Sequence, residues 1–176
     1  MYSVSIMAEA NLIVTYDPAH SGKAEEEVKF LLDSQAEKPE FMKSDIDGLF
    51  LIRTKKNPKE LTKSLNSKKN AKKFSYTYHW IPVDKWTTSK IEDMKKVMKE
   101  LNGKIDPKES WKMELGKRHF EGKTTDLILK LTENIDKPKV DLKNPQKIIK
   151  VEIIGKKAGI SLLDASEFLD VPKLKA

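Results

Sequence analysis

Cysteine is absent from the 176-residue sequence. Its absence excludes disulfide bonds, thiolate zinc sites and a cysteine nucleophile, and it fits a reducing compartment. No apolar run approaches the ~20 residues that a membrane-spanning helix needs. The N-terminal residues also lack the basic start and the long apolar core of a signal peptide. These absences predict a cytoplasmic protein that has no membrane partner.

Motifs for catalysis are missing as well. The three histidines, His20, His79 and His119, are far apart in the sequence and form no metal motif of the His-x-x-x-His type. The glycine patterns typical of a dinucleotide-binding fold or of a serine hydrolase do not occur. No sequence for binding ATP or for methyl or acetyl transfer is recognisable. We therefore expect a protein that is not an enzyme and that needs neither a metal nor a cofactor.

Positive charge exceeds negative charge, with 34 Lys and Arg residues against 27 Asp and Glu and a net charge of +7. Residues 53–73 contain nine Lys or Arg side chains and one acid, Glu60, so their local net charge is +8. Residues 25–27, by contrast, are all glutamate. Such segregation favours a nucleic acid or another anionic surface as partner. A lysine-rich proteome would give the same total charge without any partner.

The elements predicted up to residue 83 follow the order strand, helix, strand, strand, helix, strand. β-branched and aromatic runs predict the strands, and apolar residues at helical spacing after Ser21 and after Pro58 predict the two helices. The predicted strands are residues 11–16, 40–44, 48–54 and 76–81. This order is typical of a ferredoxin-like βαββαβ domain, here over residues 11–83. Residues 1–10 show no pattern and are expected to be flexible.

A second domain is predicted from residue 84 to residue 164, after a junction at residues 82–88. Ser89 and Glu92 match a capping box, and the helix that they open ends at Gly103. A strand at 111–115, a helix near Thr124 and paired strands within 147–163 follow. The last residues, 165–176, have little periodicity and are expected to form a flexible tail. The predicted fold class is α+β.

Two basic segments of this domain are candidates for binding phosphate. The first is a loop at residues 116–123 that runs from a strand into a helix, where free N–H groups and the helix dipole favour an anion. The second is the turn between the last two strands. The candidate ligands are Lys117, Arg118, His119, Lys123, Thr124, Lys156 and Lys157.

Each of these candidates has a structural alternative. The run at 117–119 can be a solvated surface loop, and His119 can pack on Phe120 instead of contacting RNA. Thr124 can serve only as a helix N-cap. Lys156 and Lys157 can be ordinary turn lysines of a hairpin.

A further candidate site lies in the first domain at Arg53, Lys55 and Lys56, within the positively charged stretch 53–73. These side chains would add affinity and salt dependence without reading a sequence. The alternative is a lysine-rich, solvated helix. The three tryptophans are interpreted as core or domain-interface residues and not as platforms for stacking bases.

The second domain resembles a THUMP domain over residues 84–163. The resemblance rests on the Trp-x-apolar strand that starts at Trp111, the Lys-Arg-His run at 117–119, the Val-Asp-Leu-Lys-Asn-Pro segment at 140–145 and the Gly-Ile-Ser-Leu segment at 159–162. THUMP is an RNA-binding module shared by thiouridine synthases, RNA methyltransferases and pseudouridine synthases. In these proteins a ferredoxin-like domain precedes it.

No catalytic domain is recognisable after this segment, so the chain is most similar to the stand-alone THUMP adaptors for tRNA acetylation, in their archaeal form. The resemblance implies that the chain holds the acceptor stem and 3′ end of a tRNA. It would then present a D-arm cytidine to a separate acetyltransferase, which forms N4-acetylcytidine. The alternatives are an RNA-binding subunit for thiolation, methylation or pseudouridylation, and a protein scaffold. The sequence specifies neither the tRNA species nor the oligomeric state.

Overall fold

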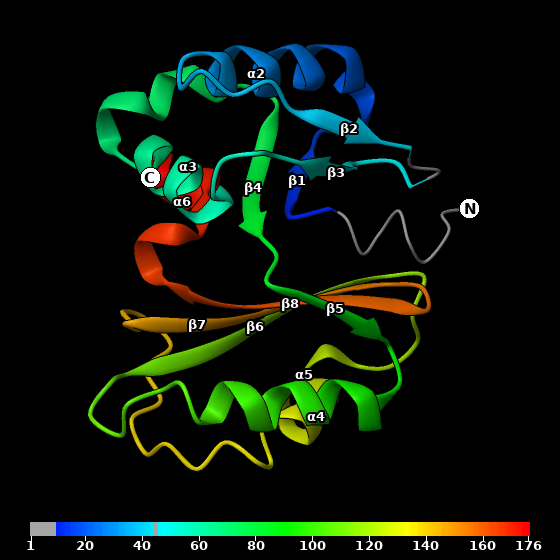
Figure 1. Cartoon of the computed structure of the whole chain (residues 1–176), viewed down its shortest axis with the longest axis vertical. Coiled ribbons are helices and arrows are strands. Elements are labelled where there is room, and N and C mark those ends of the chain that lie inside the picture. Colours follow the sequence, from blue (N-terminus) through cyan, green and yellow to red (C-terminus); the bar gives the residue numbers. More distant parts are fainter. Residues whose placement is uncertain (1–9, 44–45) are drawn as a thin grey trace. The chain divides into compact units, whose positions relative to one another are not determined.

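The computed structural model describes residues 10–43 and 46–176. The chain divides into two compact units, one formed by the described residues up to Val83 together with Ser166–Ala176, the other by Asp84–Ala165. Each unit has one β-sheet with helices packed against it (Figure 1). The predicted α+β class is therefore confirmed. Within the described residues, no helix is long and apolar enough to cross a membrane.

The first unit has the element order that the sequence predicts. Its elements are β1 (Leu12–Tyr16), α2 (Ser21–Asp33), β2 (Glu40–Met42), β3 (Leu49–Arg53), α3 (Pro58–Leu65) and β4 (Thr77–Pro82). The short helices η1 (Pro18–His20) and η2 (Lys68–Lys73) lie between them. The strand order is β2-β3-β1-β4-β9, where β9 is Leu169–Asp170, and every pairing is antiparallel. The first four of these strands have the ferredoxin-like arrangement.

The core of the first unit lies between its sheet and its helices. Val28 and Leu32 on α2 are one turn apart and pack, with Leu61 on α3, against the sheet. Trp80 on β4 is fully buried in this core, and its indole N–H donates to the Thr77 hydroxyl at 3.0 Å. Trp80 is therefore a core residue, as predicted.

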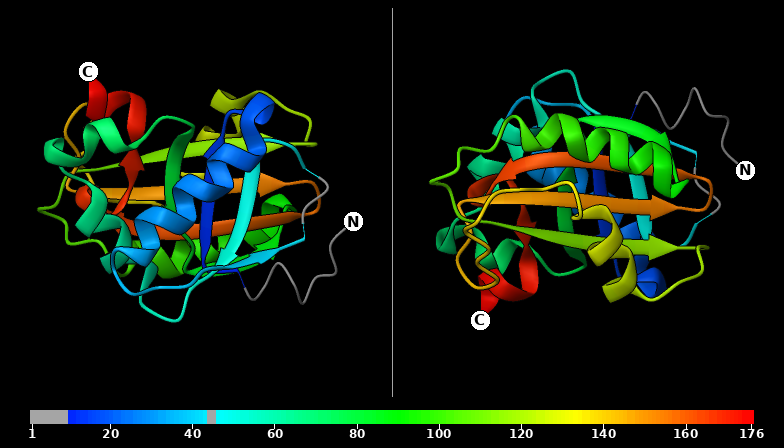
Figure 2. Two further views of the ribbon diagram at one scale, coloured as in Figure 1. Left: turned by 90° about the horizontal axis from the view of Figure 1, so that it is seen from above. Right: turned by 90° about the horizontal axis from the view of Figure 1, so that it is seen from below.

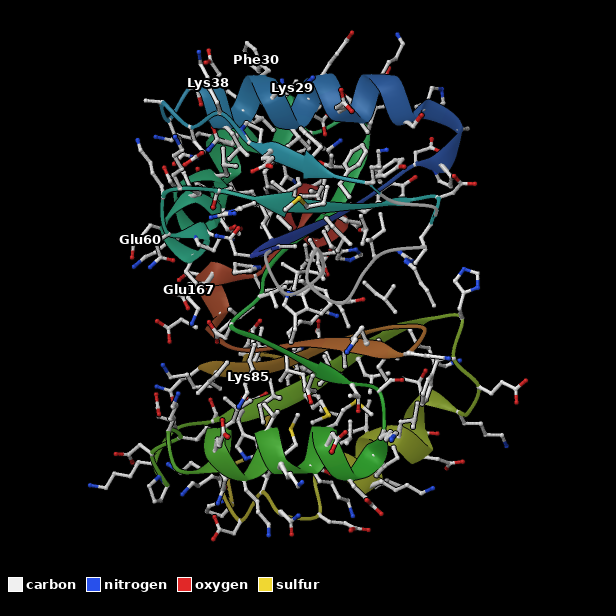
Figure 3. All side chains as sticks on the ribbon, turned by 45° about the vertical axis from the view of Figure 1, so that its right-hand side comes forward. Lys29, Phe30, Lys38, Glu60, Lys85 and Glu167 are labelled. Atoms are coloured by element: carbon white, nitrogen blue, oxygen red, sulfur yellow. The ribbon has the colours of Figure 1, made fainter. Side chains whose placement is uncertain are left out.

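One face of α2 is exposed. Phe30 is 70% exposed and projects outward from this helix, with Lys29 beside it and Lys38 close by (Figure 3). These two lysines, Phe30 and Pro39 line a shallow hollow. Phe30 is thus the most exposed large apolar residue of the described part of the first unit, and it makes no contribution to the core.

The prediction of a flexible tail at residues 165–176 is wrong. After η3 (Ala165–Glu167), the strand β9 (Leu169–Asp170) pairs with β4 and is followed by the helix α6 (Val171–Lys175). Leu169 is fully buried in the core of the first unit. A two-residue strand is too short to show periodicity, so β9 could not be predicted from a sequence pattern. Of the predicted flexible residues 1–10, only Ala10 lies within the described residues, and it is buried.

The second unit is a four-stranded sheet with both helices on one face (Figure 2). Its elements are β5 (Lys85–Thr88), α4 (Ile91–Asn102), β6 (Trp111–Arg118), α5 (Thr124–Leu131), β7 (Lys147–Ile154) and β8 (Lys157–Asp164). The strand order is β5-β8-β7-β6, in which β6 and β7 are parallel and the other pairs antiparallel. Residues 85–88, predicted as part of a junction, are therefore an outer strand of this sheet.

The core of the second unit lies between the sheet and the two helices. Met94 and Met98 on α4 and Leu131 on α5 belong to one buried cluster with Ile149 and Val151 on β7. Alternate residues of β7 face the other side of the sheet. On that side, Lys150 and Glu152 form an ion pair of 2.8 Å between buried side chains.

The predicted capping box at the start of α4 does not form. The hydroxyl of Ser89 donates to the carbonyl of Gly155 at 2.7 Å, and Lys90 is the N-cap residue without a side-chain bond. The Ser89 hydroxyl, which the sequence pattern predicted to cap the helix, is used for the bond to Gly155.

We predict that Gly116→Ala destabilises the second unit. A Cβ at Gly116 would lie 2.6 Å from both carboxylate oxygens of Glu152. Because Glu152 is buried and paired with Lys150, it cannot move without breaking that pair, and the expected loss is about 1–3 kcal/mol of unfolding free energy. Urea denaturation measures it. Gly22→Ala is the control, because a Cβ there meets nothing within 4 Å; equal losses in both variants would contradict the prediction.

We also predict that Leu169→Ala destabilises the first unit by about 2–5 kcal/mol, because it removes a fully buried side chain. Thermal and urea denaturation measure the change. Leu129→Ala on α5 is the matched control, since Leu129 is 68% exposed and its truncation leaves no cavity. An unchanged stability of the Leu169 variant would show that the C-terminal segment is not packed.

Candidate nucleic-acid interface

The two basic segments predicted from the sequence lie side by side at one end of the sheet in the second unit. Because β6 and β7 are parallel, their C-terminal ends meet at the same edge. Arg118 at the end of β6 is opposite Ile154 at the end of β7. The backbone N–H of Gly155 then donates to the carbonyl of Arg118 at 2.9 Å. The segment after β6 and the turn after β7 are therefore joined directly.

The start of α4 is held at this same edge. Thr88 at the end of β5 is opposite Lys157 at the start of β8. The backbone N–H of Ser89 donates to the carbonyl of Lys156 at 2.9 Å, next to the bond from its hydroxyl to Gly155. Lys90 follows directly and is exposed. Sequence reasoning missed Lys90, whose proximity to residue 156 depends on the pairing of β5 with β8.

Both helices begin at this edge without a capping side chain. The N-cap residues are lysines, Lys90 for α4 and Lys123 for α5, and neither side chain makes a capping hydrogen bond. Helix N-termini carry unpaired N–H groups and the positive end of the helix dipole, which favour anions. Thr124 is the first residue of α5 and not its N-cap, so the structural alternative considered for it is not realised.

We call this end of the sheet the basic edge. Its members are Lys90, Lys117, His119, Lys123, Lys156 and Lys157. Within residues 10–43 and 46–176, none of these six side chains forms a hydrogen bond or an ion pair. Lys90, His119, Lys123 and Lys156 are exposed, and Lys117 and Lys157 are half-buried. The acids nearby are Glu121 in the same loop, Glu92 and Asp93 in the first turn of α4, and Asp126 in the first turn of α5. The six members of the basic edge still outnumber these four acids.

Backbone conformation turns the chain sharply after β6. His119 has a φ of +54° and Gly122 a φ of +123°. Histidine is among the few side chains that occur in the left-handed region, whereas the value at position 122 requires glycine. Phe120 packs against the core of the unit, while His119 is exposed. The alternative in which His119 packs on Phe120 therefore does not hold.

The prediction of a loop over residues 116–123 was wrong for its first three residues. Gly116, Lys117 and Arg118 belong to β6 and pair with β7. Side chains alternate along a strand, so Lys117 lies on the helix-covered side and Arg118 on the opposite side. The Arg118 Nε atom is buried and has no hydrogen-bond partner among the described residues. The sequence suggested a loop because glycine is disfavoured in strands, but the parallel pairing overrides that preference.

The candidate residues Arg53, Lys55 and Lys56 belong to the first unit, whereas the basic edge belongs to the second. The backbone N–H groups of Lys55 and Lys56 donate to the buried carboxylate of Glu37 at 3.3 and 2.8 Å. The ammonium of Lys56 donates to the carbonyl of Gln35 at 2.5 Å. Lys56 therefore supports the turn that follows α2.

The described residues contain no group of three or more histidine, aspartate or glutamate side chains that could hold a metal ion. The basic edge offers positive charge and hydrogen-bond donors from lysines, one imidazole and backbone N–H groups. Groups of this kind suit phosphate as a ligand.

Comparison with known protein families identifies the second unit. Residues 88–163 match the model of the THUMP domain. The match extends from the end of β5 almost to the end of β8, and it includes every residue of the basic edge. The chain therefore contains a THUMP domain, as the sequence resemblance implied. A search of curated proteins found no match to the sequence.

Three solved structures have a similar fold. The first is PH1313 from Pyrococcus horikoshii Ot3, with a TM-score of 0.58 at 17% identity over 88% of this chain and 55% of that one. TrmN from Thermus thermophilus has a TM-score of 0.55 at 14% identity over 86% and 44%. A predicted N6-adenine-specific DNA methylase from Listeria monocytogenes str. 4b F2365 has a TM-score of 0.58 at 8% identity over 93% and 43%. The chain thus matches about half the length of each solved protein.

Proposed function

We propose that the chain binds tRNA through the basic edge of its THUMP domain. The observation that supports this proposal is the parallel register of β6 and β7, in which the end of β6 is bonded to the turn that carries Lys156. Folded RNA is recognised by its shape, its phosphates and its unstacked ends more than by its grooves. A cluster of cationic side chains at two uncapped helix N-termini fits phosphates at such an end.

In the finer form of this proposal, the chain is a non-catalytic adaptor. It holds the acceptor stem and 3′ end of the tRNA and sets the distance to a D-arm cytidine, which a separate acetyltransferase modifies. The support for this form is the sequence resemblance to the acetylation adaptors. RNA binding and chemistry are then divided between two proteins.

The second candidate is the RNA-binding part of a larger or different modifying enzyme, for thiolation, methylation or pseudouridylation. Two observations favour it. The chain spans only about half of each similar solved protein, and one of these is described as a predicted DNA methylase.

Mass spectrometry of tRNA nucleosides from cells that lack the chain separates the candidates. Loss of N4-acetylcytidine alone supports the adaptor, and loss of a different modified nucleoside supports the second candidate.

We predict that replacing Lys117, Lys123 and Lys156 together by alanine weakens tRNA binding by about tenfold or more at moderate salt. Each phosphate contact contributes about 0.7–0.9 to the slope of log K against log salt concentration. The variant should therefore bind with a slope that is roughly two to three units less steep. Filter binding or fluorescence anisotropy over a salt series measures both quantities.

The matched control is the triple alanine variant of Lys99, Lys104 and Lys108. These exposed lysines lie at the C-terminal end of α4 and before the start of β6, away from the basic edge, and their removal changes the net charge equally. The control should retain nearly the full affinity. Equal weakening by both triple variants would mean that net charge, and not the basic edge, governs binding.

A further inference from the structure

The strand β6 is an outer strand of the second sheet (Figure 2), and among the described residues the backbone on its outer side is paired only at its start. There the backbone N–H of Trp111 donates to the carbonyl of Lys139 at 2.9 Å, and the N–H of Asp141 donates to the carbonyl of Trp111 at 3.0 Å. Val140 forms an isolated parallel bridge with Trp111. In the described part of the chain, no other backbone pairs with this side of β6. The open edge therefore runs from Lys112 to Arg118.

The hydrogen-bond directions along β6 identify the unpaired groups. Trp111 faces outward, whereas the carbonyl of Arg118 faces inward because it accepts the bond from Gly155. Successive residues of a strand in a parallel pair face alternate sides with their backbone groups. The N–H and C=O groups of Met113, Leu115 and Lys117 therefore point outward. Together they form a row that an additional strand can pair with.

This edge differs from the other sheet edges of the described residues by its length. β6 has eight residues, whereas β5 has four, β2 has three and β9 has two. Natural proteins usually keep exposed edge strands short or interrupt them with proline. The eight residues of β6 contain no proline. Charged side chains such as Lys112, Lys117 and Arg118 also protect an edge from pairing with neutral strands, but the unpaired backbone groups remain open to a strand of opposite charge.

The segment that begins to cover β6 turns away after one bridge. The Asp141 carboxylate accepts from the backbone N–H groups of Lys143 and Asn144 at 3.0 Å each, which forms the turn. Val140 and Leu142, on either side of Asp141, are 57% and 73% exposed. The open edge thus begins beside two apolar side chains that have few contacts within the chain.

The charges along the open edge of β6 indicate which kind of strand can pair with it. The ammonium of Lys112 lies 2.5 Å from the carboxylate of Glu114, so these two charges compensate each other. Lys117 and Arg118 have no acidic partner in the described part of the chain. The C-terminal half of the edge is therefore positive and complementary to carboxylates.

A second copy of the chain fits this edge poorly. Antiparallel pairing of two β6 strands centred on Leu115 would place Lys112 of one copy opposite Arg118 of the other and Met113 opposite Lys117, so neither Lys117 nor Arg118 would face a carboxylate directly. Like charges at directly opposite positions of a strand pair are destabilising.

We propose that the open edge of β6 binds an extended acidic segment of a partner protein, which adds a strand to the sheet. The open edge shares Lys117 with the basic edge, and the test is therefore made without nucleic acid.

The test measures amide hydrogen exchange in the full chain by NMR. No nucleic acid is present in the sample. The probe is a synthetic peptide of about ten residues in which valine and glutamate alternate, which is long enough to pair with the whole edge. Exchange at Met113, Leu115 and Lys117 should slow by about tenfold or more when the peptide is added. Exchange at Glu114 and Gly116 should not change, because their N–H groups already face β7.

Two controls make the outcome decisive. A peptide that alternates valine and lysine should give no protection. Leu142→Asp, which places a negative charge beside the edge, should weaken binding of the acidic peptide, whereas Phe30→Asp on α2 should not. The proposal is overturned if no protection occurs, if both peptides protect equally, if the two variants behave alike, or if protection arises with protein concentration alone.

Discussion

The basic edge depends on the parallel pairing of β6 with β7. This pairing brings the C-terminal ends of the two strands together at one edge of the sheet. Arg118 and Ile154, which end the strands, are 36 positions apart in the sequence. The bond from Gly155 to Arg118 then fixes the turn of one strand against the exit of the other. Two basic segments that are distant in the sequence are thereby joined, and Ser89 holds the start of α4 against the same turn. The surface charge at this edge is a consequence of topology.

The register of this pairing is specified on the sheet face opposite the helices. Lys150 and Glu152 form a buried ion pair there, and Gly116 lies opposite Glu152. A buried ion pair contributes little net stability by itself, but an unpaired buried charge is costly. A shift of β6 by one residue would place Leu115 or Lys117 where only glycine leaves room for the carboxylate. Glycine at position 116 therefore favours the one register that forms the basic edge.

Local patterns predicted most of the fold. Apolar spacing in α2 and α4, and β-branched runs in β1, β4 and β7, agree with the structure because each element buries a continuous face. The errors occur where long-range contacts decide. β9 is buried by pairing with β4, Ser89 donates to Gly155 instead of capping α4, and Gly116 to Arg118 are strand residues because β7 pairs with them. Of the candidate site, the lysines at 117, 123, 156 and 157 were predictable as basic segments, whereas their adjacency and the inclusion of Lys90 depend on the register.

The most direct test of this account uses photo-crosslinking amino acids placed singly at His119 and at Lys156, with tRNA as the target. If the ends of β6 and β7 form one surface for RNA, both positions should crosslink to the same short region of the tRNA, and a probe at Lys104 should not crosslink. Crosslinks from the two positions to distant regions of the tRNA, or crosslinking from Lys104 as strong as from the other two, would contradict the account.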